Sequence, residues 1–579
     1  MKRYKKYIMP YLAAFIFGPI MMLTEVLGEI LIPRFMSMII NNGVADHDVG
    51  YILRIGLIMI VTCCFMVVGG VLGCYFSAKA SIGFSGDLRK DLFDKVQTFS
   101  FADIDNFSTG SLVTRLTNDV QQVQNFIALI LRGAMRSPGL IIGALAMALT
   151  INAQLAVIFL IVLPVLAFSI FMIMSTAYPR FQSMQKSLDK LNTTLQEALT
   201  NVRVVKSFVR EEHEEEKFNA KSNDLREKTI SAMLMVAMTL PVMSLAMNIT
   251  TVAVVWFGGC KVIAGTMQVG DLTAFITYVT QILVSLMMIA MIILQSSRAT
   301  ASFARIDEVL TAETDITDAA AASPDRLVEH GSIEFRNVTF SYPGSAGDPV
   351  LENISFTVNA GETIGILGST GCGKTSLVQL IPRLYDVSAG EVLVDGVNVK
   401  DYSLYNLREG VGMVLQYNTL FSGTISENLR WGNEQASDEE VDEAAASAQA
   451  DSFIQGFADG YERMIDQGGT NVSGGQKQRL CIARALLKKP KILILDDSTS
   501  AVDTATEARI REAFATTLKD TTKLIIAQRI GSVKEADRII VMDDGRIADI
   551  GTHSELISRC EEYREIYYSQ VDRKEEEGA

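Results

Sequence analysis

Long apolar runs and long polar stretches alternate along the first half of the chain. Six windows carry enough apolar residues to cross a bilayer, which takes about 20 residues of helix. They cover about 11–32, 51–75, 126–150, 154–176, 232–258 and 271–297. Only Asn152-Ala153-Gln154 separates the third window from the fourth, which predicts a tight hairpin. Soluble buried helices are the alternative, but six runs of this length favour membrane spans.

Two polar segments, about 77–125 and 177–231, separate the second window from the third and the fourth from the fifth. Apolar residues recur within them at helical spacing, as Leu191, Leu195 and Leu199 do. Both segments are therefore predicted to continue as helices beyond the membrane. Their charged faces are predicted to be solvated surface.

From Gly331 onward the pattern changes to short runs of strand and helix type. Ile333, Phe335 and Phe340 suggest a first strand, and strand and helix patterns alternate after it. Such alternation is typical of α/β domains with a parallel sheet. We therefore predict three parts: a transmembrane domain at 1–305, a linker at 306–330 and an α/β domain at 331–579.

Charge sets the expected orientation and excludes one class of partner. The N-terminus is basic at Lys2, Arg3, Lys5 and Lys6 and is expected to stay in the cytoplasm. An even number of spans returns the α/β half to the same side. We expect a multi-pass protein of the cell inner (cytoplasmic) membrane. A net charge of −14 argues against nucleic acid as a partner.

Residues 368–375 read GSTGCGKT and form a candidate phosphate-binding loop. They fit G-x-x-x-x-G-K-[ST] at every position, after a β-type run and before a helical one, as the motif requires. The glycines let backbone N–H groups close around phosphates, and the helix N-terminus adds partial positive charge. Lys374 is expected to reach the β- and γ-phosphates, and Thr375 is expected to bind Mg2+ beside Asp496.

An apolar run at 491–497 ends in two acids, Asp496 and Asp497. This is the pattern of a buried parallel strand that delivers carboxylates to its C-terminal edge, where nucleotide sites lie in open α/β sheets. A glycine-rich turn that binds nothing is the alternative interpretation of residues 368–375, and the acidic strand weighs against it.

Four further motifs lie in order around these two. Ser473-Gly474-Gly475-Gln476 resembles the signature motif of ABC ATPases, although a glycine-rich loop unrelated to nucleotide is the alternative. Gln416 resembles the Q-loop, Ser500-Ala501-Val502-Asp503 the D-loop, and Tyr342 the aromatic residue that stacks on adenine. With these motifs and the six predicted spans, the chain resembles an exporter-type ABC transporter. That resemblance implies a membrane α-helical bundle fused to an α/β P-loop ABC ATPase domain.

The resemblance implies ATP and Mg2+ as cofactors. It assigns catalytic roles to Asp497, Gln528, Gln416 and Asp503, and Mg2+ ligands to Thr375, Gln416 and Asp496. It assigns nucleotide binding to Tyr342, Gly368, Ser369, Thr370, Gly371, Cys372, Gly373, Lys374, Thr375, Ser376, Ser473, Gly474, Gly475 and Gln476.

Two positions depart from the pattern of the family. Asp497 stands where these ATPases carry the Glu that orients the attacking water, and Gln528 stands where they carry a switch His. The shorter Asp retracts its carboxylate by roughly 1.5 Å, and misplacement on this scale can lower a rate about 100-fold. Gln528 can hydrogen-bond a γ-phosphate but cannot carry an imidazolium charge. The chain thus resembles the degenerate-site subunit of heterodimeric bacterial multidrug exporters.

In this family each ATP lies between the Walker motifs of one ATPase domain and the signature of the other. The resemblance therefore implies a half-transporter that pairs with a second, non-identical half and completes the catalytic site of that partner. It also implies contact with the lipid bilayer and a small amphipathic substrate. A homodimeric lipid or peptide exporter and a nucleotide-gated regulatory membrane ATPase are the alternatives.

The substrate and the coupling segments are less sharply defined by sequence. By the resemblance, residues 110–116 and 200–207 are expected to contact ATPase domains. Glu25 and Glu29 share a helix face in the first window, where acids mark a pathway or a gate. The alternative places them near the outer headgroups with Arg34. Methionines crowd the last two windows, either as adaptable substrate contacts or as ordinary core.

Overall fold

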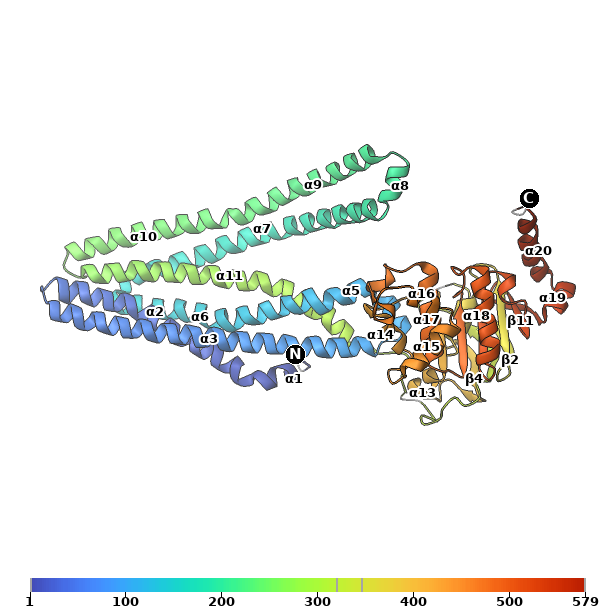
Figure 1. Cartoon of the computed structure of the whole chain (residues 1–579). Helices are drawn as coiled ribbons and strands as arrows, with labels where there is room; N and C mark the ends of the chain where they lie inside the picture. Colours follow the sequence, from blue (N-terminus) through green and yellow to red (C-terminus); the bar gives the residue numbers. More distant parts are fainter. Residues whose placement is uncertain (1–2, 319–320, 345–346, 577–579) are drawn as a thin grey trace. The chain divides into compact units, whose positions relative to one another are not determined.

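The computed structural model describes residues 3–318, 321–344 and 347–576 (Figure 1). The chain forms two compact units. A helical unit contains Met1–Gln97 and Gly110–Ala312, and an α/β unit contains Thr98–Thr109 and Glu313–Ala579. The segment at 98–109 therefore belongs with the α/β fold although it lies far away in sequence. The predicted boundaries at 305 and 330 remain predictions.

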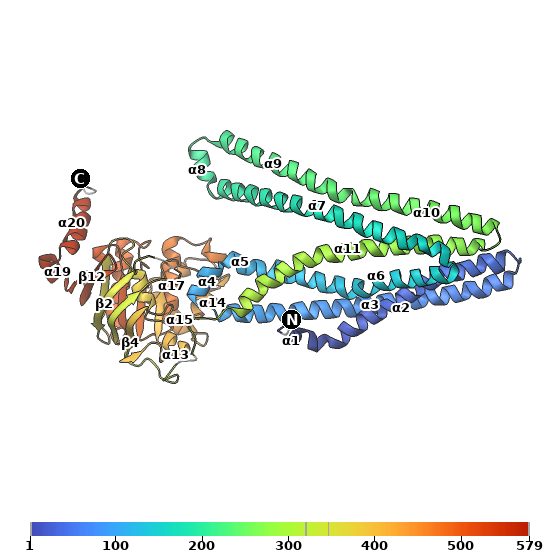
Figure 2. The ribbon, with the colours of Figure 1, turned by 180° about the vertical axis from the view of Figure 1, so that it is seen from behind.

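Long helices make up the helical unit, and short helical segments connect them. The long helices are α2 (Leu12–Met38), α3 (Val49–Gln97), α6 (Val120–Ile151), α7 (Ala153–Thr200), α9 (Glu211–Ala237), α10 (Thr239–Ile263) and α11 (Val269–Thr311). The short segments are α1 (Lys5–Ile8), η1 (Met9–Tyr11), η2 (Ile39–Val44), α5 (Thr109–Thr114), η3 (Arg115–Asp119) and α8 (Val202–Ser207). In both views α9 and α10 run beside α7 (Figures 1 and 2).

Six helical stretches among the described residues are long and apolar enough to cross a membrane. They run over Lys5–Val44, Val49–Gln97, Thr109–Ile151, Ala153–Thr200, Glu211–Ile263 and Val269–Thr311. Each of the six predicted windows lies inside one of them, so the predicted spans are confirmed. The helices also continue through the polar segments, as predicted, with α3 ending at Gln97 and α7 at Thr200.

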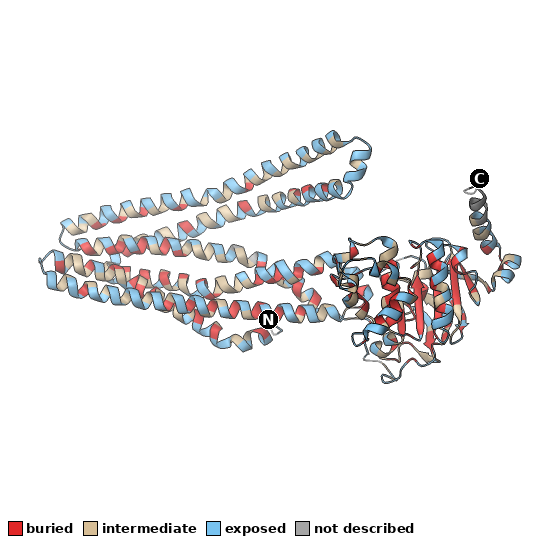
Figure 3. Ribbon diagram, in the orientation of Figure 1, coloured by how far each residue is buried: buried red, intermediate tan, exposed pale blue. Residues whose placement is uncertain are grey.

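Large apolar side chains lie on the outside of the helical unit. Phe65, Leu160 and Trp256 are all at least 70% exposed, and buried positions are sparse along these helices (Figure 3). A helix that is apolar on all sides, without a protein core to cover it, fits a hydrocarbon environment. The chain is a multi-pass membrane protein.

The interior of the helical unit is held by packed rings and by backbone capping. Phe159 and Phe275 stack with ring centroids 5.1 Å apart, and the buried hydroxyl of Tyr278 donates to the carbonyl of Ile30 at 2.8 Å. Asn152 caps α7 by accepting from the N–H of Leu155 at 3.1 Å. The predicted hairpin between α6 and α7 is therefore confirmed: Asn152 ends α6 through its backbone N–H and begins α7 through its side chain.

The α/β unit is built, within the described residues, on a six-stranded sheet in the order β12-β11-β3-β10-β9-β6. These strands are β3 (Thr363–Gly368), β6 (Val411–Val414), β9 (Ile492–Asp496), β10 (Thr522–Ile526), β11 (Arg538–Asp543) and β12 (Arg546–Gly551). All neighbouring pairs are parallel except β11 and β12. The carboxyl ends of β3, β9 and β10 therefore meet at one edge, where ligands bind in open parallel sheets. The predicted fold class is confirmed.

Smaller sheets and short helices complete this unit. An antiparallel sheet has the order β2-β1-β4-β5, and β7 pairs with β8. The strands are β1 (Ile333–Phe340), β2 (Leu351–Val358), β4 (Ala389–Val394), β5 (Val397–Asn398), β7 (Gly423–Thr424) and β8 (Met464–Ile465). The helices are α12 (Lys374–Gln379), α13 (Leu404–Glu409), α14 (Ile425–Arg430), α15 (Asp438–Ser447), α16 (Asp451–Gln455), α17 (Gly474–Leu487), α18 (Thr504–Thr517), α19 (His553–Arg559) and α20 (Glu561–Glu576).

Helix α4 (Phe101–Phe107) also packs in the α/β unit. Ser100 and Asp103 form a reciprocal cap at its start, and Ala102 is buried in the core that surrounds the antiparallel sheet. Residues 110–116, which sequence assigns to contact with an ATPase domain, belong to the helical unit, and that contact stays a prediction. Residues 98–109, with the buried Ala102, are the preceding segment that packs with the α/β fold.

Candidate functional site

The loop after β3 can close only because its glycines lack side chains. Gly368, Gly371 and Gly373 all have positive φ, at 153°, 90° and 92°. A Cβ on Gly368 would lie 2.2 Å from the carbonyl oxygen of Met542, and one on Gly373 would lie 2.7 Å from Leu351. The motif glycines thus allow both the left-handed backbone and the close approach of neighbouring elements.

A cavity of about 530 Å³ opens at the carboxyl ends of β3, β9 and β10. This size lies within the range of small-molecule sites. It brings together most of the residues that sequence assigned to the nucleotide and the metal: Tyr342, Gly368, Ser369, Thr370, Gly371, Gly373, Lys374, Thr375, Ser376, Gln416, Asp496, Asp497 and Gln528. Cys372 is buried instead, and its sulfur lies 3.7 Å from Nζ of Lys374.

Lys374 and Thr375 connect the loop to the acidic strand. Nζ of Lys374 donates to the carbonyl oxygens of Gly368 at 2.9 Å and Ser369 at 2.7 Å. The hydroxyl of Thr375 donates to Oδ1 of Asp496 at 3.1 Å. A lysine held across a loop of backbone N–H groups is suited to bind phosphate oxygens.

Asp496 is buried at the end of β9 and keeps one oxygen available. Its side chain is 1% exposed, and among the described residues Oδ2 has no hydrogen-bond partner. Burial raises the pKa of Asp496, and the hydrogen bond from Thr375 opposes this increase. A buried carboxylate oxygen without a partner, beside a threonine hydroxyl, is a donor set that fits a hard cation such as Mg2+.

Asp497 and Gln528 contact each other directly. Nε2 of Gln528 donates to Oδ2 of Asp497 at 2.9 Å. The backbone of Asp497 has a φ of 48°, which is uncommon outside glycine. Burial raises the pKa of Asp497, while the bond from Gln528 and the charges of Lys374 and Arg529 oppose the increase. The two unusual positions in the sequence therefore form one polar pair.

Tyr342 lines the cavity and belongs to an aromatic cluster with Phe340 and Tyr385. The hydroxyl of Tyr342 lies 2.8 Å from Oγ of Ser376. Tyr342 packs edge-on against Phe340, with centroids 4.9 Å apart, and against Tyr385, with centroids 5.1 Å apart. Sequence reasoning missed Tyr385, because no motif marks it and its partners come from distant strands. Tyr342 thus lies where the sequence predicts an aromatic residue beside the phosphate-binding loop.

The predicted signature and D-loop residues pack against each other and do not line this cavity. Ser473 caps α17, accepting from the N–H of Gln476 at 3.3 Å while Gln476 accepts from the N–H of Ser473 at 2.9 Å. A Cβ on Gly475 would lie 2.9 Å from the carbonyl oxygen of Ala501. Asp503 caps α18 through the N–H of Thr506 at 3.0 Å. None of the residues that line the cavity belongs to 473–476 or 500–503.

Gln478 is a second residue that sequence reasoning missed. It is 5% exposed, its Oε1 accepts from the N–H of Ala501 at 3.0 Å, and its Nε2 donates to Ser500 at 3.3 Å. The sequence offered one sign of this role: Gln478 lies one turn into α17, three residues after the pair Gly474-Gly475. Gln478 holds the signature helix and the D-loop together as one surface.

The two acids of the first span have a partner that the sequence did not reveal. Nη2 of Arg136, on α6, lies 2.5 Å from Oε1 of Glu29 and 3.5 Å from Oε1 of Glu25. All three side chains are 24% exposed. Arg34, which the headgroup alternative placed near them, pairs with Asp271 at 2.9 Å. Glu25 and Glu29 are therefore part of an ion-pair cluster between α2 and α6.

Comparison with known proteins agrees with both units. The family described as ABC transporter transmembrane region matches residues 15–286, and the family described as ABC transporter matches residues 351–500. The uncharacterized ABC transporter ATP-binding protein YfiB of Bacillus subtilis is 41% identical over 574 residues, which cover 99% of each chain. The ATP-dependent lipid A-core flippase of Syntrophus aciditrophicus is 34% identical over 86% of this chain and 83% of its own.

A solved structure shares the fold over the same length. A bacterial Atm1-family ABC exporter with ATP bound matches with a TM-score of 0.79 and 23% sequence identity, covering 98% of each chain. The glycine-rich loop after β3, the acidic end of β9 and the capped helix α17 thus stand on one chain with six helical stretches, among the described residues, that can span a membrane. The chain belongs to the ABC transporter family and is an ATP-hydrolysing half-transporter of the exporter type.

Proposed function

We propose that this chain is the degenerate-site half of a heterodimeric exporter in the inner membrane of the cell. The observation that carries the proposal is the hydrogen bond between Gln528 and Asp497. A carboxylate one methylene shorter than Glu is displaced from an attacking water, and a neutral amide brings no positive charge to the γ-phosphate. This site therefore binds ATP and turns it over slowly.

The roles of the cavity residues follow from their positions. The N–H groups of 368–373 and Nζ of Lys374 bind the phosphates, and the ring of Tyr342 stacks on adenine. Thr375, Asp496 and Gln416 hold Mg2+, which neutralises phosphate charge when bound. Asp497 and Gln528 lie at the γ-phosphate end, because both follow strands whose carboxyl ends face the loop.

The signature of this chain serves a different site. Ser473 and Gln476 cap α17 in an intact arrangement, and Gly475 accepts the close approach of the D-loop. These residues do not line the cavity of their own chain. In the proposed pair they complete the ATP site of the partner, together with Asp503, and most hydrolysis takes place there.

An apolar tip on the helical unit supports the need for a second ATPase domain. The segment between α7 and α9 leaves Val204 and Phe208 exposed, at 53% and 72%. Apolar groups at the end of a polar hairpin indicate a protein contact. This is the second segment, 200–207, that sequence assigned to coupling.

Transport then follows from ATP binding rather than from its hydrolysis alone. ATP joins the two ATPase domains and shifts the bundle from an inward-open to an outward-open state, and hydrolysis in the partner's site resets it. The cargo is a small amphipathic molecule. Apolar side chains on the outside of the bundle, such as Phe65 and Leu160, are consistent with access of such a molecule from the lipid.

A homodimeric lipid exporter is the second candidate. It is favoured by the similarity to the lipid A-core flippase. In a homodimer, however, every ATP would meet both an altered Walker site and an intact signature, so both sites would be slow. A regulatory ATPase without transport has no feature in the described residues that favours it.

Unequal effects of two substitutions test the heterodimer. The chain is co-expressed with a half-transporter encoded beside it, and ATPase turnover is measured for Ser473→Ala and Asp497→Ala. In a heterodimer the first removes most turnover and the second has a much smaller effect. In a homodimer both changes affect the same sites and are equally damaging, which would refute the proposal.

Ser437→Ala is the matched control for capping. Ser437 caps α15 through the same reciprocal pair with Glu440, at 3.3 Å and 3.0 Å, and does not line the nucleotide cavity. Loss of a cap costs about 1 kcal/mol of stability, so Ser437→Ala is expected to lower stability like Ser473→Ala and to leave turnover unchanged.

A further inference from the structure

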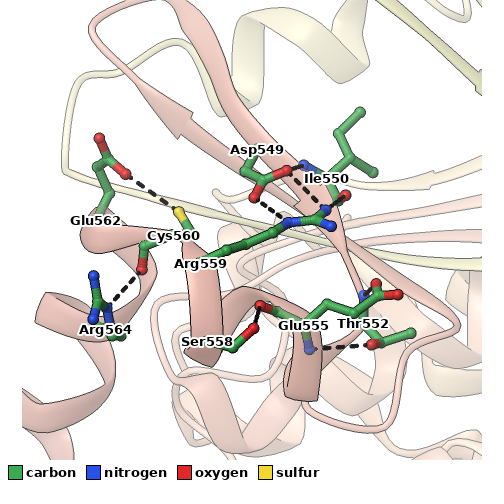
Figure 4. Close-up of polar contacts among 9 residues, drawn as sticks. All are labelled: Asp549, Ile550, Thr552, Glu555, Ser558, Arg559, Cys560, Glu562 and Arg564. Atoms are coloured by element: carbon green, nitrogen blue, oxygen red, sulfur yellow. Dashed lines mark hydrogen bonds and ion pairs between the residues drawn. The ribbon is translucent and has the colours of Figure 1, made fainter.

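Helix α19 fixes the start of the following helix, α20, to strand β12 at the edge of the large sheet. Thr552 and Glu555 form a reciprocal cap on α19, and Arg559 at its end donates to both carboxylate oxygens of Asp549, at 2.7 Å and 3.0 Å (Figure 4). The same guanidinium donates to the carbonyl of Ile550 at 2.7 Å. The turn that leads into α20 is therefore held on β12.

Helix α20 then packs into the core that contains the turn after β10. Tyr563 is fully buried, and its hydroxyl lies 2.7 Å from Nδ1 of His553. Tyr563 shares one core cluster with Ile530, and Ile566 and Tyr567 pack against it. The helix is thus anchored at one end and follows the segment that carries Gln528.

Two turns after Tyr563, the side chain of Gln570 holds that segment on both sides of Arg529. Its Oε1 accepts from the N–H of Ile530 at 2.9 Å, and its Nε2 donates to the carbonyl of Gln528 at 2.8 Å. A primary amide is suited to this because it is donor and acceptor at once. Two backbone groups that follow a strand end are satisfied by one side chain.

We infer that Gln570 is a positioning residue for the ATP site, acting through the backbone of Gln528. The side-chain amide of Gln528 donates to Asp497 at 2.9 Å, so its reach is set by where its backbone is held. A shift on the order of 1 Å is enough to lose a productive contact. Through Gln570, the C-terminal helix fixes the residue that faces the γ-phosphate.

This inference rests on the proposed role of Gln528 at the γ-phosphate and makes a selective claim. ADP lacks the γ-phosphate, so the position of Gln528 affects the binding of ATP and leaves that of ADP unchanged. General damage to the fold would lower both affinities, because the loop at 368–375 and Tyr342 serve both nucleotides.

The test measures equilibrium binding of ATP and of ADP, with Mg2+, to the purified full-length chain. Gln570→Ala removes both hydrogen bonds, and each contributes modestly in competition with water, so the Kd for ATP is expected to rise about fivefold. The Kd for ADP is expected to stay within about twofold. Gln570→Glu keeps the acceptor for Ile530 but sets an oxygen against the carbonyl oxygen of Gln528. This variant is expected to bind ATP at least as weakly as Gln570→Ala does.

Ser569→Ala is the matched control on the same helix. Its hydroxyl donates only within α20, to the carbonyl of Ile566 at 2.8 Å. The affinities of this variant for both nucleotides are expected to equal those of the unchanged chain. Equal thermal unfolding midpoints of the Ser569 and Gln570 variants would exclude a difference in folding.

A double-mutant cycle separates the inference from the proposal beneath it. Gln528→Ala should raise the Kd for ATP and leave the Kd for ADP unchanged. Gln570→Ala should then raise the Kd for ATP no further, because the effects of residues that act through each other are not additive. If Gln528→Ala leaves ATP binding unchanged, both the role of Gln528 and the inference fail. If Gln528→Ala weakens ATP but Gln570→Ala does not, or weakens ATP and ADP equally, or adds its full loss in the double variant, the inference alone is overturned.

Discussion

The hydroxyl of Tyr385 donates to Oδ2 of Asp105 at 2.8 Å, which joins helix α4 to the aromatic cluster that contains Tyr342. The ring of Tyr385 lies edge-on to Phe101 of α4, with centroids 6.1 Å apart, and edge-on to Tyr342, with centroids 5.1 Å apart. Tyr342 in turn contacts Ser376 behind the phosphate-binding loop. A continuous set of contacts thus connects the proposed adenine site to the segment at 98–109, which packs in the α/β unit.

Removal of the Tyr385 hydroxyl should weaken the coupling between transport substrate and ATP hydrolysis more than it weakens hydrolysis itself. Tyr385→Phe keeps the ring packing and deletes one hydrogen bond to a carboxylate, an interaction of about 1.5–3 kcal/mol. Substrate stimulation of ATPase turnover is expected to fall several-fold, while basal turnover of the paired transporter changes little. Stimulated and basal rates are compared in lipid nanodiscs.

Tyr405→Phe is the matched control, because Tyr405 is 74% exposed in the same unit. Asp105→Asn should reproduce the effect of Tyr385→Phe from the other side, and the double variant should be no worse than either single one. Full stimulation in Tyr385→Phe would show that the contact is structural only.

Local features were predictable from sequence, and contacts between distant residues were not. The six spans were visible because each is a continuous apolar run, and the loop at 368–375 because its motif is contiguous. Tyr385 and Asp105 are 280 positions apart, and Arg136 and Glu29 are 107 apart. Neither pair leaves a periodic signal in the chain, so the sequence showed two acids without their partner and gave no sign that residues 98–109 pack with the α/β unit.

Restoration of the two altered positions should raise turnover. Asp497→Glu with Gln528→His returns the longer carboxylate and a group that can carry charge, and correction of a misplacement near 1 Å can recover about 100-fold in rate. We expect the chain with both changes to gain ATPase activity in its own site, measured by phosphate release from the paired transporter with the partner's site inactivated. The single changes should recover less than the double change. Turnover that stays at the starting level in the double variant would place the defect elsewhere.

The cluster of Arg136 with Glu25 and Glu29 should behave as a unit. Arg136→Met alone leaves two carboxylates close together in a poorly solvated position and should lower stability strongly, since an uncompensated buried charge costs several kcal/mol. The triple variant, with both acids changed to Gln, should recover most of the loss. The midpoint of thermal aggregation in detergent measures the stability of Arg136→Met and of the triple variant. A triple variant that is no more stable than Arg136→Met would show that the three side chains do not act as a unit.

The same cluster changes the expectation for substrates. Two acids without a partner would attract cations, but Arg136 offsets one of the two charges. Gln at both acids should therefore affect stability and gating for cationic and neutral cargo alike. Dye uptake into inverted vesicles, compared between a cationic and a neutral dye of similar size, measures this. A loss confined to the cationic dye would restore a direct role for the acids in recognition.

Acid sensitivity of the α/β unit should depend on Asp395. Its carboxylate accepts from four successive backbone N–H groups, those of residues 329–332, at 2.8–3.0 Å. Burial alone would raise the pKa of Asp395, but these bonds outweigh it and leave the pKa below its ordinary value. A carboxyl with a lowered folded-state pKa stabilises the fold above its unfolded pKa of about 3.9, and this contribution is lost as the pH falls through the folded value.

Asp395→Asn should therefore lower the unfolding midpoint at neutral pH, and the gap to the unchanged chain should close in acid. Asn retains part of the hydrogen bonding, so a loss of about 1–2 kcal/mol is expected near pH 7. Asp544→Asn is the control, because Asp544 also precedes a glycine in a turn with positive φ, at 41° against 50° for Asp395, and is exposed. Unfolding midpoints of the three chains are measured from pH 7 down to about pH 3, across the unfolded pKa. A gap that stays constant over this range would mean that the charge of Asp395 does not hold residues 329–332, and that the shape of the turn alone does.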